Sequence, residues 1–200
     1  NLLSQVFLFN GQYSQSKHLA DLAWELAAVR RNERDFIRAA LLQGLAALRL
    51  EDLQKADERL HFALRKVRAV QAVEDELQVL NALAEFHHKT SEPEKAREYL
   101  EEVWDRAEQG PYPLLHADAL NILAQIEIAA GNHEAAITAA TQAYQKAWCD
   151  GPPYAYHYGL EKAKSLLKEL GTKEPEMPPF DPSKFEPMPE VEIDPGEEEE

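Results

Sequence analysis

Cysteine, basic residues and long apolar runs are all scarce in this chain. Its 200 residues include a single cysteine, Cys149. One cysteine cannot form an internal disulfide, which fits a reducing compartment such as the cytoplasm. No apolar run approaches the ~20 residues that a membrane-spanning helix needs, so no membrane association is expected. Lys and Arg number 21 against 36 Asp and Glu, a net charge of −15. A phosphate backbone repels such a chain, which disfavours nucleic-acid binding.

Motifs that carry chemistry are equally sparse. The sequence shows no Ser–His–Asp order, no phosphate-cradling glycine loop and no prominent carboxylate pair. The only histidine doublet is His87-His88. Adjacent helical residues point about 100° apart, so these two cannot share a metal as an i, i+4 pair could. We therefore expect no enzyme activity, no metal site and no cofactor.

What the sequence does contain is a repeat of 40 residues. The turn segment at 131–136, Gly-Asn-His-Glu-Ala-Ala, has counterparts at 91–96, 51–56 and 11–16. A period between roughly 20 and 50 residues is the mark of a solenoid, which offers an extended concave surface for binding. A large side chain recurs at the same spacing, and this stripe is predicted to be core: Trp24, Leu64, Trp104 and Tyr144.

Each period reads as two amphipathic helices with apolar residues at i, i+3/i+4 and i+7. We expect residues 1–170 to form one domain, an all-α, right-handed solenoid of antiparallel helix pairs. Its last helix, 154–170, is unpaired and caps the array. The predicted helices lie near 1–9, 13–29, 34–50, 53–70, 74–89, 93–109, 114–130, 133–148 and 154–170.

Small residues recur where paired helices must approach each other. They are Gly44, Ala84 and Ala124 in the first helices, and Ala56, Ala96, Ala136, Ala23, Ala63 and Ala143 in the second. With these positions the chain resembles a tetratricopeptide repeat array. Its 40-residue period exceeds the usual ~34, and in this it is similar to the repeats of kinesin light chains and of sensors on bacterial signal-transducing, STAND-type ATPases. The resemblance implies a module that binds a protein or a peptide.

The resemblance also implies that the first helix of each repeat lines a concave groove. One column of that face holds Asn1, Leu41, Asn81 and Asn121. An asparagine carries a donor and an acceptor and can bind a peptide backbone, as the similar asparagines of kinesin light chains do. Equally open is that Asn81 and Asn121 bond across to the next helix. The predicted groove residues are Arg38, Leu41, Leu45, Gln78, Asn81, Glu85, His88, Asp118, Asn121 and Gln125.

The segment 171–200 differs from the repeats. It holds seven of the twelve prolines and eleven acidic residues against two lysines, a net charge of −9. Such a segment cannot bury enough apolar surface to order itself. It is either a solvated tail or a strand pinned along the outer surface of the last repeats. Its apolar residues would do the pinning: Met177, Phe180, Phe185, Met188, Val191 and Ile193.

Two functions remain open. The first is a ligand-sensing module within a larger signalling ATPase, connected to an upstream domain of the same polypeptide. In the 40-residue frame Asn1 coincides with Asn81 and Asn121, so the chain starts inside a first helix. The second is a structural scaffold that associates with itself or a fixed partner and has no sensing role.

Overall fold

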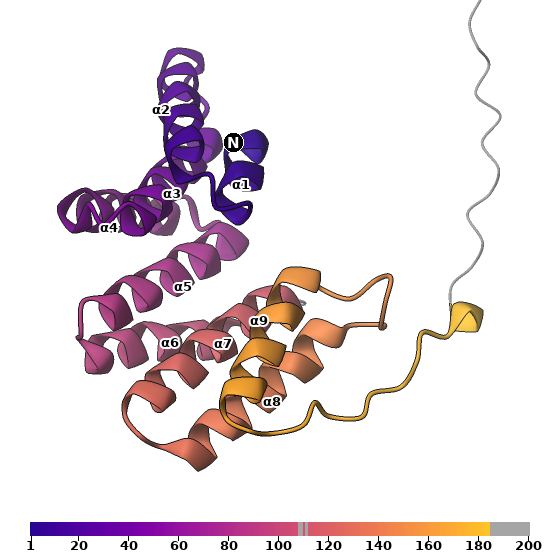
Figure 1. The fold of residues 1–200 in the computed structure, drawn as a ribbon. Coiled ribbons are helices and arrows are strands. Elements are labelled where there is room, and N and C mark those ends of the chain that lie inside the picture. Colours follow the sequence, from indigo (N-terminus) through magenta and orange to yellow (C-terminus); the bar gives the residue numbers. More distant parts are fainter. Residues whose placement is uncertain (108–109, 111, 185–200) are drawn as a thin grey trace, which may run out of the picture.

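The computed structural model describes residues 1–107, 110 and 112–184, and within these ranges the regular structure is helical throughout. Helices α1 to α9 form consecutive antiparallel pairs, with α9 unpaired at the end (Figure 1). The all-α solenoid expected from the repeat is therefore confirmed. The helices are α1 (Leu2–Phe9), α2 (Tyr13–Arg30), α3 (Glu33–Arg49), α4 (Leu53–Val70), α5 (Val73–Lys89), α6 (Pro93–Ala107), α7 (Pro113–Ala129), α8 (His133–Trp148) and α9 (His157–Glu169), followed by the 3-10 turn η1 (Pro182–Lys184).

The predicted helix boundaries that fall on described residues agree within three residues, with the largest difference at α9, whereas the predicted end of the sixth helix at 109 lies outside the described residues. This helix was predicted to begin at residue 154 and begins at His157. The reason is the turn that precedes it, in which the Tyr154 N–H donates to the Gly151 carbonyl at 2.8 Å. The Tyr156 N–H then donates to the Ala147 carbonyl of α8, also at 2.8 Å. These two bonds hold residues 154–156 out of the helix.

A residue in the left-handed backbone conformation follows the first helix of every repeat. It lies at positions 11, 51, 91, 131 and 171, all with φ between 62° and 76°. Gly131 donates its N–H to Ile128, and the next residue, Asn132, donates to Glu127, which together close the helix end. Glycine adopts this conformation at little cost. Glu51 and Ser91 adopt it without being glycine, which shows that the repeat geometry imposes the turn.

Small residues let the paired helices approach closely. Ala56, Ala84, Ala96 and Ala124 are fully buried. At Gly44 a Cβ would lie 2.7 Å from Leu60 Cδ2, so α3 and α4 require glycine there. Of the large-residue stripe, Leu64 and Tyr144 are buried, while Trp24 and Trp104 are partly buried against the core. Trp104 packs against both main apolar clusters and so joins the middle of the array to its C-terminal part.

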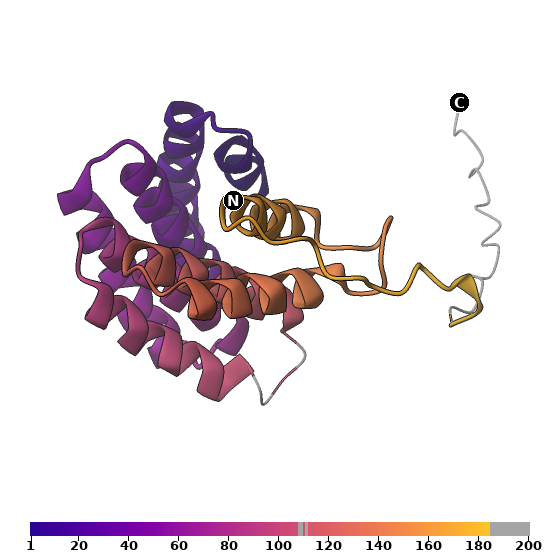
Figure 2. The ribbon, with the colours of Figure 1, turned by 60° about the horizontal axis from the view of Figure 1, so that its bottom comes forward.

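The array curves so strongly that its two ends meet. The rings of Phe9 in α1 and Tyr158 in α9 have centroids 4.8 Å apart. Figure 2 shows the last helix, α9, next to the first, α1. The capping helix α9 therefore does two things: it covers α7, and it closes the curved face against α1.

The described part of the tail runs along the outer helix α8 and away from the inner face. Tyr144 donates to Glu174 Oε2 at 3.1 Å, and Trp148 Nε1 donates to the Pro178 carbonyl at 2.9 Å. Met177 packs on the last apolar cluster, and Phe180 contacts the ring of Tyr154 at 4.9 Å. The predicted pinning is thus observed for Met177 and Phe180. The remaining predicted anchors, Phe185, Met188, Val191 and Ile193, lie outside the described residues.

Candidate functional site

A concave groove of about 520 Å³ lies on the inside of the curve. The first helices α3, α5 and α7 form its floor, and α1 and α9 close it from either end. An adjoining hollow of about 340 Å³ shares Leu41, Leu45 and Gln78 with it, so the two are continuous. The apolar part of the groove wall consists mainly of Leu8, Phe9, Leu41, Leu45, Leu115 and Ile122.

Most of the predicted site residues line this surface. Six of them face the groove: Leu41, Leu45, Gln78, Asn81, Glu85 and Asp118. Arg38 lines the adjoining hollow and pairs with Asp75, its Nε lying 2.7 Å from Oδ1. The structure therefore brings together the residues predicted from α3, α5 and the first half of α7.

Three predicted residues do not line the groove: His88, Asn121 and Gln125. Asn121 is 0% exposed and its Nδ2 donates to the Gly159 carbonyl of α9 at 3.0 Å. The prediction that Asn121 faces an open groove is wrong, because α9 packs where the first helix of a further repeat would lie and covers α7. His88 is half-buried at the end of α5, where burial lowers the pKa of its imidazole.

The asparagine column bonds across the repeats. Asn1 Nδ2 donates to the Asp35 carbonyl at 3.2 Å, and Asn81 Nδ2 donates to the Leu115 carbonyl at 2.9 Å. Together with Asn121, each asparagine thus links one first helix to the first turn of the next. In all three side chains the Oδ1 atom is buried without a hydrogen-bond partner. The Nδ2 group of each amide thus donates within the fold, whereas its Oδ1 accepts no hydrogen bond.

Charged residues meet at the centre of the groove. Arg49 Nη2 lies 2.9 Å from Oε1 and 3.0 Å from Oε2 of Glu85, so these two neutralise each other. Next to them, Tyr156 donates its hydroxyl to Asp118 Oδ2 at 3.1 Å. Burial raises the pKa of the Asp118 carboxyl to about 7, although the Tyr156 hydrogen bond and the charge of Lys162 act in the opposite direction. Asp118 is thus poised to gain or lose a proton near neutral pH.

The sequence did not point to Arg49, Tyr156, Tyr158 or Lys162. Arg49 follows Leu41 by eight residues on the same helix face, so its position was available from the periodicity. Tyr158 and Lys162 belong to α9 and Tyr156 directly precedes it, and all three reach the groove only because the array curves back on itself. No local pattern specifies that curvature.

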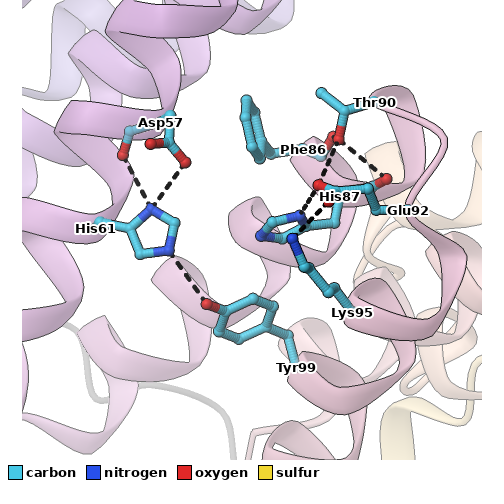
Figure 3. A network of polar contacts seen from close by, with 8 residues as sticks. All are labelled: Asp57, His61, Phe86, His87, Thr90, Glu92, Lys95 and Tyr99. Carbon is cyan, nitrogen blue, oxygen red and sulfur yellow. Dashed lines mark hydrogen bonds and ion pairs between the residues drawn. The ribbon is translucent and has the colours of Figure 1, made fainter.

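A second polar cluster lies away from the groove, between α4, α5 and α6 (Figure 3). His61 Nδ1 lies 3.0 Å from Asp57 Oδ1, and its Nε2 lies 3.3 Å from the Tyr99 hydroxyl. His87 stacks on Tyr99 with ring centroids 5.4 Å apart, and its Nδ1 lies 2.8 Å from Glu92 Oε2. His87 is thus held in the packing of α5 against α6, while His88 lies on another side of the same helix.

Comparison with known families agrees with the helix pairs of this groove. Residues 75–147 match the family model described as tetratricopeptide repeat. Helices α5 to α8 are therefore similar to tetratricopeptide repeats. The matched stretch runs from the first turn of α5 almost to the end of α8, and so includes two helix pairs and two of the three helices of the groove floor. Tetratricopeptide repeats are in general protein-interaction modules. No curated protein matches the chain. Among the described residues, no helix is long and apolar enough to cross a membrane.

Proposed function

We propose that this chain binds an extended segment of a protein partner in its concave groove. The observation that carries the proposal is the groove itself, which combines apolar walls with a polar centre. Its volume of about 520 Å³ falls within the range of roughly 300–1,000 Å³ typical of ligand sites. Fixed polar groups on an apolar surface give a binding site its specificity, and a purely structural face would not need Arg49, Glu85 and Asp118 side by side.

A selection from random peptides displayed on phage, with the full chain immobilised, tests this function. Selected peptides are then measured by calorimetry against Leu45→Glu, which places a charge on the apolar wall. The matched control is Val70→Glu, because Val70 is an exposed apolar residue at the end of α4 and outside the groove. We expect the first change to abolish binding and the second to leave it intact. Equal binding by both variants would place the ligand elsewhere.

We further propose that the module works within a larger signalling ATPase in the cytoplasm. The resemblance to STAND-type sensors supports this parent, and the exposed, unpaired Cys149 suits a reducing compartment. The apolar end of the array supports an additional domain. Leu2 is 77% exposed, whereas its counterpart one period later, Leu42, is 6% exposed under a neighbouring helix. The α2 residues Leu22, Leu26 and Val29 extend the same uncovered face.

In the alternative function, a structural scaffold, the same apolar face would bind a second copy of the chain. Sedimentation velocity of the chain separates the two. A monomer at micromolar concentration favours a face that another domain of the polypeptide covers. A dimer that Leu26→Ser and Val29→Ser dissociate would favour the scaffold. A Walker-type phosphate loop encoded upstream in the same gene would support the ATPase.

A further inference from the structure

Two acceptors of the groove, the Asp118 carboxyl and Asn81 Oδ1, lack a partner cation and a donor, respectively, among the described residues. Arg49 pairs through Nη2 with Glu85, and the Tyr156 hydroxyl donates to Asp118. Asp118 itself forms no ion pair with any residue that the structure describes. Asn81 lines the same groove, is 7% exposed, and its Oδ1 has no donor. A ligand that supplies several N–H groups would complement this surface.

We propose that the groove receives a lysine or arginine side chain of the bound peptide, which pairs with Asp118, while neighbouring apolar side chains of that peptide pack on Leu41 and Leu45. This inference rests on the function proposed above and specifies its partner. An ammonium or guanidinium group has only donors, which complement the Asp118 carboxylate and the Asn81 Oδ1 atom. Because burial weakens solvent screening, an ion pair at this depth contributes more than one on the surface.

The charge of the chain as a whole favours the same partner. With −15 in total and −9 in residues 171–200, the repeats carry about −6. A net negative field raises the encounter rate with a basic segment and lowers it with an acidic one. Lys162 is the one cation in the groove without an ion pair among the described residues, and its presence makes an acidic ligand the competing possibility.

The position of Asp118 in the groove makes the pH dependence of binding diagnostic. Below pH 7 its carboxyl holds a proton, and a cationic ligand must displace that proton; affinity therefore rises from pH 6 to pH 8. An anionic ligand gives the opposite slope. The other charged groups in or beside the groove are Arg49, Glu74, Glu85, His88 and Lys162. Burial lowers the pKa of the His88 imidazole, which loses its positive charge as the pH rises. This loss also favours a cationic ligand at higher pH, so the variant Asp118→Asn is needed to separate the two effects.

The phage selection provides the test. We expect peptides selected by the native chain to be enriched in Lys or Arg next to apolar residues. A synthetic peptide of that sequence should bind Asp118→Asn at least tenfold more weakly, with little change in affinity between pH 7 and pH 8. Asp105→Asn removes the same charge from the exposed face of α6 and should bind as the native chain does. Asparagine keeps the shape of the side chain and an acceptor for Tyr156, and a melting curve verifies folding.

Four outcomes would overturn the inference. Peptides enriched in Asp or Glu would assign the groove to an acidic partner held by Lys162. Basic peptides that bind Asp118→Asn as tightly as the native chain would show that another carboxylate receives the charge. Peptides without a preference for charge, yet blocked by Leu45→Glu, would contradict this inference and leave the proposed function standing. Selection of no peptide at all would contradict both.

Discussion

The ring of Phe9 in the first helix lies 4.8 Å from the ring of Tyr158 in the last, so the two ends of the solenoid touch. An isolated stack of helix pairs is held by contacts between neighbours only. Here a single aromatic contact connects α1 to α9 and encloses the groove that the intervening first helices line. The groove is therefore bordered by an interaction between segments at opposite ends of the helical domain.

This contact should be measurable as a coupling energy. We expect Phe9→Ala and Tyr158→Ala each to lower the free energy of unfolding. A double-mutant cycle should give a coupling of about 0.5–1.5 kcal/mol, the range of aromatic pairs beyond their buried area. Urea denaturation provides the measurement. Leu2→Ala, a change on the same helix at a residue that faces solvent, is the control and should cost little. A coupling of zero would mean that the ends do not meet in solution.

Trp104 should be a principal contributor to stability. It packs between the two main apolar clusters, so its removal leaves a cavity that both must border. Large-to-small changes of this kind cost roughly 3–5 kcal/mol, and the lower end applies here because Trp104 is only partly buried. Val29→Ala, at a side chain that is 83% exposed, should change stability by less than about 0.5 kcal/mol. A loss below about 1 kcal/mol for Trp104→Ala would remove it from the core.

The asparagines of the column should contribute to the stability of the fold. Asn121→Ala breaks the bond to Gly159 and leaves that carbonyl buried, which costs about 1–3 kcal/mol. Asn81→Ala should cost about 1 kcal/mol through the bond to Leu115. Chemical denaturation measures the loss of stability in both variants, and we expect the larger loss for Asn121→Ala. Asn10→Ala, at an exposed residue, is the control. If Asn121→Ala unfolded at the same urea concentration as the native chain, the cross-repeat bond would contribute nothing.

The described tail should stabilise the last repeat without affecting the groove. Removal of residues 172–200 deletes the hydrogen bonds of Tyr144 and Trp148, each worth about 0.5–1.5 kcal/mol. We expect faster amide exchange in α8 and a red shift of the Trp148 fluorescence. Peptide affinity should stay the same, because residues 172–184 do not line the groove. Higher affinity after the deletion would show that the tail competes with the ligand.

The repeat predicted the helices, and the resemblance to tetratricopeptide arrays predicted which of them form the floor of the groove. The 40-residue period fixes which residues share a face, so Leu41, Leu45, Gln78, Asn81 and Glu85 were found from the sequence. The closure of the groove by α9 could not be predicted from the sequence, because it depends on the summed rotation between successive helix pairs. A small rotation per repeat decides whether α9 meets α1, and no residue encodes it locally. For the same reason the sequence placed Asn121 on an open face that α9 covers.

The raised pKa of Asp118 predicts a pH dependence of stability. Its folded-state pKa of about 7 exceeds the ordinary value of 3.8, so the folded chain binds the proton more tightly than the unfolded chain does. The stability contributed by this bound proton is present below about pH 4 and is lost as the pH rises toward 7. The full shift corresponds to about 4 kcal/mol, and partial exposure of the groove reduces this to an expected 1–2 kcal/mol.

Asp118→Asn should therefore gain stability relative to the native chain at pH 8 and show a smaller gain at pH 5. Asparagine cannot ionise, and it keeps an oxygen for the Tyr156 hydroxyl. Urea unfolding of both proteins at the two pH values gives the difference directly, and Asp105→Asn controls for the change in net charge. A difference that is independent of pH would show that Asp118 is ionised at pH 5 in the folded chain. The carboxylate would then be charged throughout the range in which a basic ligand binds, and the affinity for that ligand would not rise between pH 6 and pH 8.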